Sequence, residues 1–413
     1  ALITNQYFKQ IKIPQFVVSD VNVETEALLK KIYKNLPDQS IAITGTNGKT
    51  SVVWYISKIL TLLNYSNSSL GTLGHYRNGK KLNEVELTTP FYEDIYKYGN
   101  SNIKNKNIFI FEASSHALEQ NRLRSYPVNI AAITNISKDH LDFHKNFSNY
   151  KKAKIKLFTK HLSMNGLAII NSRIKNSLNI GKKLINKNCK VIYFGKNYIF
   201  FKKFKKGFQL NINKKKFILK RLKLNTDIEL ENLECAIACC IALKINEKLI
   251  INVLPSITNA PGRLQKLNYI KKKSKIIIDY AHTPEALKRI LKSFEINKIK
   301  PSIVFGCGGN RDVTKRKEMG IIANKYAKKV YITDDNPRNE NPSKIRKNIL
   351  IHCPSGIEVP NRKMAIKKAI KDIISNEILI IAGKGHEKFQ IKKNKKEKFD
   401  DLKIAKEIIL NDK

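Results

Sequence analysis

The chain has 413 residues, of which 42% are hydrophobic, enough for two or three folded domains and too apolar for a disordered chain. It carries 78 Lys and Arg against 34 Asp and Glu, a formal net charge of +44. Such a charge ordinarily indicates a nucleic-acid partner, but these lysines run through every segment without an arginine-rich cluster or interleaved aromatics. We therefore interpret them as solvated surface lysines and expect no nucleic-acid partner, although a cationic field favours polyanionic small substrates.

No apolar run approaches the roughly 18 residues that cross a membrane, and no signal peptide is visible. The six cysteines show neither paired metal spacing nor the pattern of a secreted disulfide scaffold. Three of them, Cys235, Cys239 and Cys240, fall in an apolar helix, where core packing is the simpler interpretation. We expect a cytoplasmic protein without a membrane partner.

Residues 1–36 predict a strand at Gln15–Val18 and a helix at Val23–Tyr33, too little for a domain. From residue 37 to 266, short apolar runs alternate with helical segments, as in a parallel sheet covered by helices. Residues 197–222 differ, because apolar residues alternate with lysines across Gly207 and predict antiparallel hairpins. A helix is expected at Glu231–Leu243.

Pro261-Gly262 marks a change of unit, and residues 267–413 predict a second domain. Its expected strands, 276–280, 302–307, 330–333 and 378–382, alternate with helices at 284–294, 317–328, 343–351 and 364–374. Ligands bind such sheets at the carboxyl ends of the strands, where polar clusters stand at 279–282, 306–311, 334–338 and 383–387. The predicted fold is α/β, with a central P-loop ATPase domain on a mostly parallel sheet and a C-terminal Rossmann-like doubly wound domain.

A glycine loop in the first of these domains predicts nucleotide binding. Residues 44–50, TGTNGKT, follow the apolar run 41–43 and precede a helical segment at 51–63. Lys49 would reach the β/γ-phosphates and the Thr50 hydroxyl would hold Mg²⁺. The usual pattern has a glycine where this chain has Ile43, and a chance glycine turn is the alternative. Alone, the loop indicates ATP or GTP use.

A carboxylate and a histidine end two further strands of the same domain. Glu112 ends the run 108–111, and His140 follows the run 130–133. On neighbouring strand ends beside a phosphate loop, they can complete a Mg²⁺ site. Each alone is equally compatible with a helix cap or a satisfied loop residue.

With these motifs in view, the chain resembles the Mur ligases, ATP-dependent enzymes that add amino acids to a UDP-linked muramoyl precursor of peptidoglycan. The resemblance covers essentially all residues and rests on TGTNGKT (44–50), LGTLG (70–74), TTP (88–90), EASSHALEQNRL (112–123), TNISKDHLDFH (134–144), YKKAKIKLF (150–158), DYAHTP (279–284), FGCGGNRD (305–312), DDNPRNENP (334–342) and AGKGHEKFQ (382–390). The last two strings point to the branch that adds the third residue of the peptide.

The resemblance implies a role for each matching residue. The catalytic group is Lys49, Glu112, His140 and Lys154, and the metal ligands are Thr50, Glu112, His140 and Lys154, the last as a carbamate. ATP would contact Gly45, Thr46, Asn47, Gly48, Lys49, Thr50, Ser51, Asn232, Arg263, Asp279 and His282. The UDP-muramoyl-peptide would contact Thr88, Thr89, Ser114, Gln120 and Arg122. A helix over Tyr150–Phe158 is expected, with Tyr150, Lys154 and Phe158 on one face, where apolar neighbours would bury the Lys154 stem. Without the family match, Lys154 would be interpreted as a plain surface lysine of a lysine-rich helix.

The string Asp335-Asn336-Pro337-Arg338 accompanies meso-diaminopimelate, rather than lysine, in this family. Diaminopimelate has an extra carboxylate at its far end, and an arginine fork binds a carboxylate bidentately. The implied diaminopimelate site comprises Arg311, Asp335, Asn336, Pro337, Arg338, Gly383 and Glu387. An ordinary Asx-Pro turn is the alternative interpretation of the string.

The implied reaction phosphorylates the D-glutamyl carboxylate of UDP-N-acetylmuramoyl-L-alanyl-D-glutamate with ATP and Mg²⁺. The amine of meso-diaminopimelate then attacks the acyl phosphate. A lysine-adding sister ligase and a folylpolyglutamate synthase-like ligase are alternatives, and a nucleic-acid-dependent P-loop NTPase is the alternative from another class. We expect a monomer.

Three departures from the family pattern stand out. Residues 1–36 match only the end of the family's uridine-binding domain and the linker, so the chain is expected to be a fragment. Ser172 and Arg173 stand where acidic residues are usual, and Glu229 stands where asparagine is common, which leaves the adenine pocket open.

Overall fold

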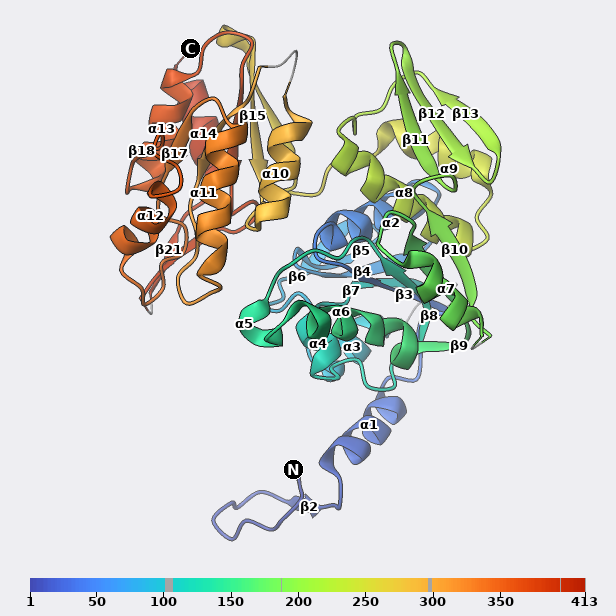
Figure 1. Ribbon diagram of the computed structural model, residues 1–413. Coiled ribbons are helices and arrows are strands. Elements are labelled where there is room, and N and C mark those ends of the chain that lie inside the picture. The colour runs from blue at the N-terminus through green and yellow to red at the C-terminus, as the bar shows by residue number, and fades with distance from the viewer. Residues whose placement is uncertain (101–106, 187, 296–298, 394, 413) are drawn as a thin grey trace.

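The computed structural model of the protein describes residues 1–100, 107–186, 188–295, 299–393 and 395–412. The first elements are the parallel strand pair β1 (Leu2–Thr4) and β2 (Gln15–Val17), followed by helix α1 (Val21–Ile32). Figure 1 shows them extending away from the central domain. Leu29 is the buried residue of α1 and joins the core of that domain.

An eight-stranded sheet forms the centre of the molecule, in the order β10-β9-β8-β3-β7-β4-β5-β6. Its strands are β3 (Gln39–Thr44), β4 (Asn67–Gly71), β5 (Gly74–Arg77), β6 (Lys80–Asn83), β7 (Ile108–Glu112), β8 (Val128–Ile133), β9 (Leu162–Asn171) and β10 (Lys190–Phe194). The pairs from β10 to β4 are parallel, whereas β5 and β6 are antiparallel. The predicted mostly parallel sheet is therefore confirmed.

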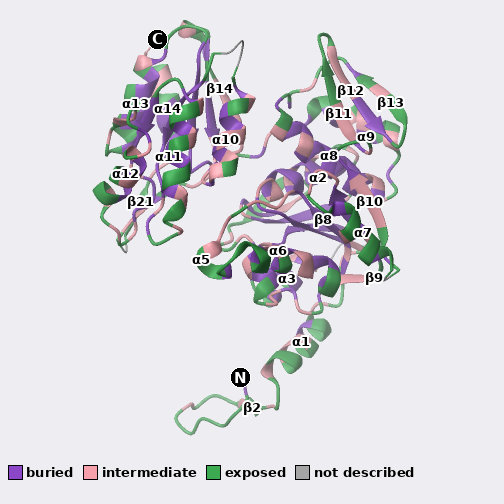
Figure 2. Cartoon of the chain, viewed as in Figure 1, coloured by how far each residue is buried: buried purple, intermediate pink, exposed green. Residues whose placement is uncertain are grey.

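Two apolar layers cover this sheet, one on each face. Successive residues of β3 alternate between them, because side chains alternate along a strand: Ile41 and Ile43 enter one core and Ala42 the other. The first core contains α2 (Lys49–Leu62), α8 (Asp227–Ala242) and α9 (Glu247–Val253). The second face carries α3 (Tyr92–Gly99), α4 (Ser115–Glu119), α5 (Leu141–His144), α6 (Phe147–Lys156), the π-helix Leu157–His161 and α7 (Ser177–Ile185). Figure 2 shows the buried residues concentrated between these layers.

Helix α8 is buried along most of its length and begins at Asp227, four positions before the expected start. Its cysteines lie in the core, as predicted. Thr226 caps the helix by accepting from the Glu229 N–H at 3.2 Å, and the Glu229 carboxylate accepts from the Thr226 N–H at 2.7 Å. This reciprocal pair satisfies donors that would otherwise be buried without partners.

Replacing Thr226 with alanine is expected to lower the free energy of unfolding by about 1 kcal/mol, because it leaves one N-terminal donor of α8 without its acceptor. Denaturant titration measures the change. Thr159→Ala, at an exposed position, is the control and should change stability by less than about 0.5 kcal/mol. Equal effects of the two substitutions would contradict the capping role.

A three-stranded antiparallel sheet stands apart from the central sheet. It consists of β11 (Phe200–Phe204), β12 (Gly207–Ile212) and β13 (Lys215–Leu219), in that spatial order. These are the hairpins predicted from the alternation of apolar residues with lysines. Leu210 and Ile212 face the core beneath them.

The C-terminal sheet has six strands in the order β14-β15-β19-β16-β17-β18. They are β14 (Gln265–Tyr269), β15 (Ser274–Asp279), β16 (Ser302–Phe305), β17 (Val330–Ile332), β18 (Ile357–Glu358) and β19 (Ile378–Ala382), and only β14 is antiparallel to its neighbour. One core holds α10 (Pro284–Ser293), α11 (Thr314–Tyr326) and α12 (Pro342–Leu350), and the other holds α13 (Arg362–Asp372) and α14 (Asp401–Leu410). Strand β14 joins this sheet at Gln265, just before the domain start expected at residue 267.

A small hairpin of β20 (Phe389–Lys392) and β21 (Lys395–Lys398) completes the C-terminal domain. In Figure 1 this domain stands beside the central one. Among the described ranges, no helix combines the length and apolar character needed to span a membrane.

Candidate active site

The loop between β3 and α2 is the candidate phosphate site, and two glycines shape it. The φ angle is 147° at Gly45 and 90° at Gly48. A Cβ at Gly45 would lie 1.9 Å from the Thr134 hydroxyl oxygen, so the end of β8 packs directly on the loop. Asn135 accepts from the Asn47 N–H at 3.0 Å and donates to the Asn47 carbonyl at 2.9 Å. Side chains of the two residues that follow β8 thus fix the shape of the loop.

Gly48 ends the loop against Asn232 of α8. An added Cβ would lie 2.3 Å from the Asn232 Oδ1 atom, and L residues rarely adopt this φ. Gly48→Ala is therefore expected to raise the KM for ATP by about tenfold, because both the loop and Asn232 must move. Initial-rate kinetics measures this effect.

Gly79→Ala is the matched control for that substitution. Gly79 has a φ of 79°, so alanine is strained there too, but the nearest atoms around its Cβ are 3.6 Å away and lie outside the loop. Its KM for ATP should match that of the parent protein. An equal rise in both variants would contradict a role specific to Gly48.

Two lysines converge on the backbone of this loop. Lys49 Nζ donates to the carbonyls of Gly45, at 2.9 Å, and Thr46, at 3.1 Å. Lys154 Nζ donates to the same Gly45 carbonyl at 2.7 Å and lies 4.5 Å from the Tyr150 ring centroid. Burial lowers the pKa of Lys49, and burial together with the Lys49 charge lowers the pKa of Lys154 well below its ordinary value. The sequence argument that Lys154 is buried is confirmed, since its side chain is 1% exposed.

Glu112 lies directly beside the first turn of α2. Thr50 Oγ1 donates to one Glu112 oxygen at 3.0 Å, and the Thr72 N–H donates to the other at 2.8 Å. Arg263 from the start of the C-terminal unit donates to the Thr50 hydroxyl at 3.2 Å. Ser51, the next residue of α2, is buried. The structure therefore brings the predicted Thr50, Glu112 and Arg263 together.

His140 lies on the turn before α5, with a φ of 52°. Its Nε2 atom is 3.4 Å from the Asp139 carboxylate, and its ring is 4.8 Å from the His116 ring, centroid to centroid. Burial lowers the pKa of His140 to about 3, so its imidazole is neutral near pH 7. Among the described residues, its recorded partners do not include Glu112 or Lys154.

The residues predicted to hold the muramoyl-peptide gather around the end of β7. Thr89 Oγ1 donates to the Glu112 carbonyl at 2.7 Å and accepts from the Ser114 N–H at 2.9 Å. Arg122 donates to the Thr89 carbonyl at 2.8 Å and, through Nε, to Gln120 at 2.8 Å. Thr88 lies apart from these contacts, 3.1 Å from the Thr72 hydroxyl.

Three further candidate ATP residues belong to the C-terminal part of the chain: Arg263 before β14, Asp279 at the end of β15 and His282 in the loop that follows. Asp279 accepts from the backbone N–H groups of Leu264 and Ala281, both at 2.8 Å. The guanidinium of Arg263 stacks 4.3 Å from the Tyr280 ring centroid. His282 Nδ1 lies 2.8 Å from the Tyr280 carbonyl.

His282 also acts across the two domains. Burial would raise the pKa of Asp139, but electrostatic interactions with His140, His282 and Lys315, together with the hydrogen bond from the His140 N–H, lower it below its ordinary value. His282 and Lys315 belong to the C-terminal domain, so its strand ends face the central phosphate loop.

The candidate amino-acid site is a hydrogen-bonded cluster at the ends of β17 and β19. Asn336 Nδ2 donates to Glu387 Oε2 at 2.9 Å, and Lys384 Nζ donates to Asn336 Oδ1 at 3.0 Å. Lys384 Nζ is also 3.8 Å from Asp335 Oδ1. Arg338 donates to the Gly309 carbonyl at 2.9 Å and, among the residues the structure describes, has no carboxylate within ion-pair distance.

Backbone contacts hold the rest of this cluster. A Cβ at Gly383, where φ is 111°, would lie 2.6 Å from Asp335 Oδ2, and one at Gly309 would lie 2.0 Å from the Pro337 carbonyl oxygen. Arg311 is exposed. Two effects lower the pKa of Arg338: burial is the larger, and the positive charge of Arg311 nearby is the second.

Sequence reasoning missed two buried members of the cluster, Lys384 and Gln390. The Gln390 side chain donates to the backbone carbonyl of Asp335 at 2.7 Å, and the Arg338 N–H donates to the Ile391 carbonyl at 3.1 Å. Lys384 and Gln390 both lie within the family string 382–390, which could have pointed to them. In a lysine-rich sequence, however, nothing distinguishes one buried lysine from its solvated neighbours.

The departures from the family pattern are accommodated locally. Arg173, which stands where acidic residues are usual, donates to the buried Glu234 at 2.7 Å. The Glu234 carboxylate thus supplies its counter-charge. Glu229 caps α8 and accepts from Asn259 at 2.6 Å. Its carboxylate is fully buried and engaged by the protein.

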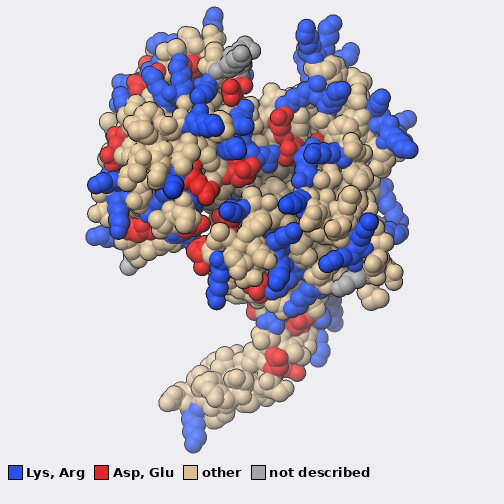
Figure 3. All heavy atoms as spheres, in the orientation of Figure 1, with Lys and Arg blue, Asp and Glu red and all other residues tan. Residues whose placement is uncertain are grey.

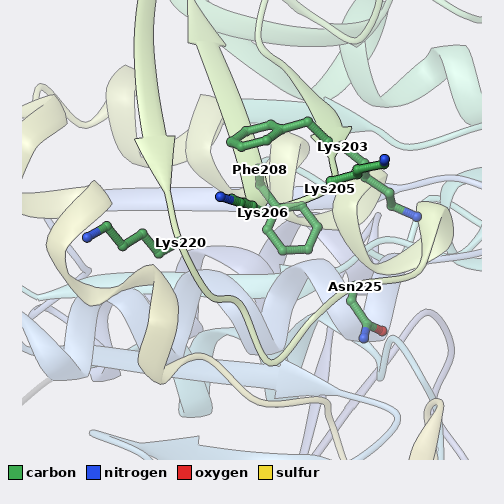
Figure 4. Close-up of a pocket in the computed structure, with 8 residues that line it drawn as sticks. Lys203, Lys205, Lys206, Phe208, Lys220 and Asn225 are labelled. Carbon is green, nitrogen blue, oxygen red and sulfur yellow. The ribbon is translucent and has the colours of Figure 1, made fainter.

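Lys and Arg are spread over the visible face of both domains and do not form a single patch (Figure 3). A pocket of about 380 Å³ lies on the β11–β13 sheet, away from the loops described above. In Figure 4 its Lys220 lies on one side, and Lys203 and Lys205 on the other, so the ammonium groups do not converge. Within the described ranges, no group of three or more His, Cys, Asp or Glu side chains is arranged to hold a metal ion.

Comparisons with known proteins agree with this architecture. Residues 43–240 match the Mur ligase middle domain, and residues 262–385 match the Mur ligase, glutamate ligase domain. A UDP-N-acetylmuramoyl-L-alanyl-D-glutamate–2,6-diaminopimelate ligase of Rickettsia bellii is 40% identical, over 94% of this chain and 84% of its own. One of Buchnera aphidicola subsp. Baizongia pistaciae is 36% identical, over 92% and 80%.

Solved structures give the same result. A UDP-N-acetylmuramoyl-L-alanyl-D-glutamate–2,6-diaminopimelate ligase has a TM-score of 0.65 at 28% identity, covering 100% of this chain and 87% of that one. The E. coli FolC structure has a TM-score of 0.66 at 16% identity, over 87% and 89%, and shares the fold alone. The chain belongs to the Mur ligase family.

Proposed function

We propose that this protein is an ATP-dependent, ADP-producing ligase of peptidoglycan synthesis. It joins meso-2,6-diaminopimelate to the D-glutamyl carboxylate of UDP-N-acetylmuramoyl-L-alanyl-D-glutamate. The observation that carries the amino-acid assignment is one cluster in which Asn336 donates to Glu387 at 2.9 Å and Arg338 donates to the Asn336 carbonyl at 3.4 Å. Relatives that are 36–40% identical carry the same activity in their names.

The reaction has two steps. The D-glutamyl carboxylate attacks the γ-phosphorus of ATP, the bond to the β,γ-bridging oxygen breaks, and ADP leaves. The amine of diaminopimelate then attacks the acyl carbon, phosphate departs, and the amine loses a proton to give the amide. Lys49 on the phosphate loop supplies positive charge to the transferring phosphoryl group.

The residues around Thr50 fit Mg²⁺ through the chemistry of their donor set. Thr50 offers a hydroxyl and Glu112 a buried carboxylate 3.0 Å away, and Mg²⁺ prefers oxygen ligands. His140, neutral at physiological pH, is the further candidate ligand. When bound, Mg²⁺ neutralises charge on the phosphates. The protein's own residues orient the donors through the Thr72 N–H and Arg263.

Lys154 is proposed to act as a carbamate. A neutral amine reacts with CO₂, and burial beside Lys49 favours the neutral form. The product replaces a cation beside the phosphate loop with an anionic oxygen ligand. The alternative, a solvated lysine, does not suit a side chain that is 1% exposed.

The muramoyl-peptide is proposed to lie along Thr88, Thr89, Ser114, Gln120 and Arg122. Arg122 offers a cation beside Phe91, whose ring centroid is 4.8 Å from the guanidinium carbon. At the other domain, Arg338 and Arg311 suit the distal carboxylate of diaminopimelate, and Glu387 and the Gly383 backbone suit its distal ammonium. Closure of the C-terminal domain over the acyl phosphate would exclude water.

The alternatives are weaker. The folylpolyglutamate synthases share the fold, and a lysine-adding sister ligase shares the ATP chemistry. Arg338, which has no carboxylate within ion-pair distance among the described residues, favours a substrate with an extra carboxylate. Nucleic-acid dependence was suggested only by the charge of +44, and on the face visible in Figure 3 the Lys and Arg side chains are spread out and form no single patch. We further propose a cytoplasmic monomer.

The test is ADP production by the purified protein with ATP, Mg²⁺ and UDP-N-acetylmuramoyl-L-alanyl-D-glutamate, comparing diaminopimelate with lysine. Diaminopimelate should stimulate ADP release and lysine should not, in the absence of nucleic acid. Stimulation by lysine alone would support the lysine-adding sister. ADP release that requires DNA or RNA would support the NTPase.

A further inference from the structure

Lys384, on the loop after β19, is a fully buried lysine beside the candidate amino-acid site. Its Nζ donates to Asn336 Oδ1 at 3.0 Å and to Glu387 Oε2 at 3.1 Å, and lies 3.8 Å from Asp335 Oδ1. Lysine is almost never fully buried unless it is paired. Its three partners come from two strand ends, so Lys384 joins both halves of the site.

The partners of Lys384 are themselves held in fixed orientations. Asn336 Oδ1 also accepts from the Ile391 N–H at 3.0 Å, while its Nδ2 donates to Glu387, so the direction of the amide is determined. Tyr280 donates to the other Glu387 oxygen at 3.3 Å. The Glu387 side chain nevertheless remains 31% exposed and accessible to a ligand.

The charges around this site are set by a few side chains. Asp335 and Glu387 are negative, whereas Arg338, Arg311 and Lys384 are positive. The two amino acids under comparison differ at their distal ends: diaminopimelate carries an ammonium and a carboxylate there, and lysine carries an ammonium alone. A site with excess negative charge would accept lysine readily, because only the ammonium requires a partner.

We propose that Lys384 is a specificity-determining residue, whose buried ammonium offsets the carboxylates of Asp335 and Glu387 and so disfavours an amino acid with a bare distal ammonium. This inference rests on the proposed function and deepens it. Lys384 is fully buried and therefore does not contact the amino acid directly. It acts through Asn336 and Glu387, to which it donates hydrogen bonds. The Lys384 ammonium repels the ammonium of the competing amino acid, and such a repulsive contact often contributes to specificity.

The experiment compares three forms of the protein in the ADP-release assay. Lys384→Met removes the charge, Lys384→Gln keeps hydrogen-bond donors without the charge, and Lys388→Met is the control. Lys388 is exposed, lies on the same loop, and has no recorded side-chain partner among the described residues. The measurements are kcat/KM for diaminopimelate, kcat/KM for lysine, and the KM for ATP.

In both Lys384 variants, the ratio of kcat/KM for diaminopimelate to that for lysine is expected to fall by at least about tenfold. The KM for ATP should stay within about twofold of the parent value, and Lys388→Met should keep the parent ratio. A merely structural role would lower both amino-acid activities and ATP binding together, and that result would overturn the inference. An unchanged ratio in either folded Lys384 variant would also overturn it.

If neither neutral variant folds, Lys384→Arg decides the question, because it keeps the charge. It should retain selectivity within about threefold of the parent, and loss of selectivity in folded Lys384→Arg would overturn the inference. A parent protein that does not prefer diaminopimelate would overturn the proposed function itself. A selective parent with an equally selective Lys384→Met variant would overturn this inference alone.

Discussion

Replacing Lys154 with alanine is expected to lower kcat about a thousandfold, the magnitude typical of removing a charged group that acts on a transferring phosphoryl group. The Lys154 amine lies 2.7 Å from the Gly45 carbonyl, within the phosphate loop. As a carbamate, it would supply an anionic oxygen beside the phosphate loop. The alanine variant would lack this anionic oxygen next to Lys49 and the bound phosphates. Steady-state ADP release measures the effect, and circular dichroism checks that the fold is retained.

Two further observations separate a carbamate from a plain lysine. Formate or acetate should restore part of the activity of Lys154→Ala, because a small carboxylate replaces the lost oxygen. The parent protein should lose activity in CO₂-depleted buffer and regain it with bicarbonate, since burial lowers the pKa of Lys154 and so favours the neutral amine that reacts with CO₂.

Lys156→Ala is the matched control, two positions along the same helix. Lys156 is partly exposed and pairs with Glu119 at 2.8 Å, away from the loop, so its removal should leave kcat nearly unchanged. Near-normal turnover by Lys154→Ala would refute the carbamate and leave Lys154 with a structural role only.

Arg338→Ala is expected to lower kcat/KM for diaminopimelate by about 2–4 kcal/mol, or roughly 30- to 1000-fold, because a bidentate partner for the distal carboxylate is lost. Its guanidinium is half-buried, and its hydrogen bonds to the described residues come from Nη1 alone, so Nε and Nη2 can receive an incoming carboxylate. The KM for ATP should barely change. Initial-rate kinetics with varied diaminopimelate measures the difference.

Two variants control for that result. Arg338→Lys keeps the charge without the planar fork and should recover only part of the activity. Arg221→Ala removes an exposed arginine after β13 and should behave like the parent. If Arg338→Ala uses diaminopimelate as well as the parent does, the assignment of the string 335–338 to this substrate is wrong.

The local patterns predicted most of the secondary structure. Apolar runs gave the positions of β3, β7, β8 and the C-terminal strands, because parallel strands covered on both faces must be apolar at successive positions. The predicted starts of helices were less accurate than the strands. Helix α2 begins at Lys49 instead of residue 51, and α8 begins at Asp227 instead of Glu231. Capping residues such as Thr226 lie outside the apolar period and so escape a prediction based on it.

Other elements were not anticipated. The strands β5, β6, β20 and β21 have only four residues each, too few to show an alternating apolar pattern. Of these, β6 and β21 are also rich in Lys and exposed. The helix expected at Tyr150–Phe158 ends at Lys156 and continues as the π-helix Leu157–His161. Tyr150, Lys154 and Phe158 are nevertheless all buried, as their spacing predicted.

By itself, the sequence determined the α/β class, the phosphate loop and the family, because these depend on short contiguous strings and on the period of apolar residues. Only the tertiary structure decided which side chains meet. It placed Lys154 on the Gly45 carbonyl, Arg263 on Thr50, and Lys384 between Asn336 and Glu387. These pairs, apart from Lys384 and Glu387, are separated by 48 to 213 positions in the chain. Lys384 and Asn336 meet because the parallel strands β17 and β19 bring their carboxyl ends to one edge of the C-terminal sheet. Lys154 instead reaches the phosphate loop from helix α6, and Arg263 reaches it from the segment before β14. Burial distinguishes Lys154 and Lys384 from the many lysines that remain in solvent.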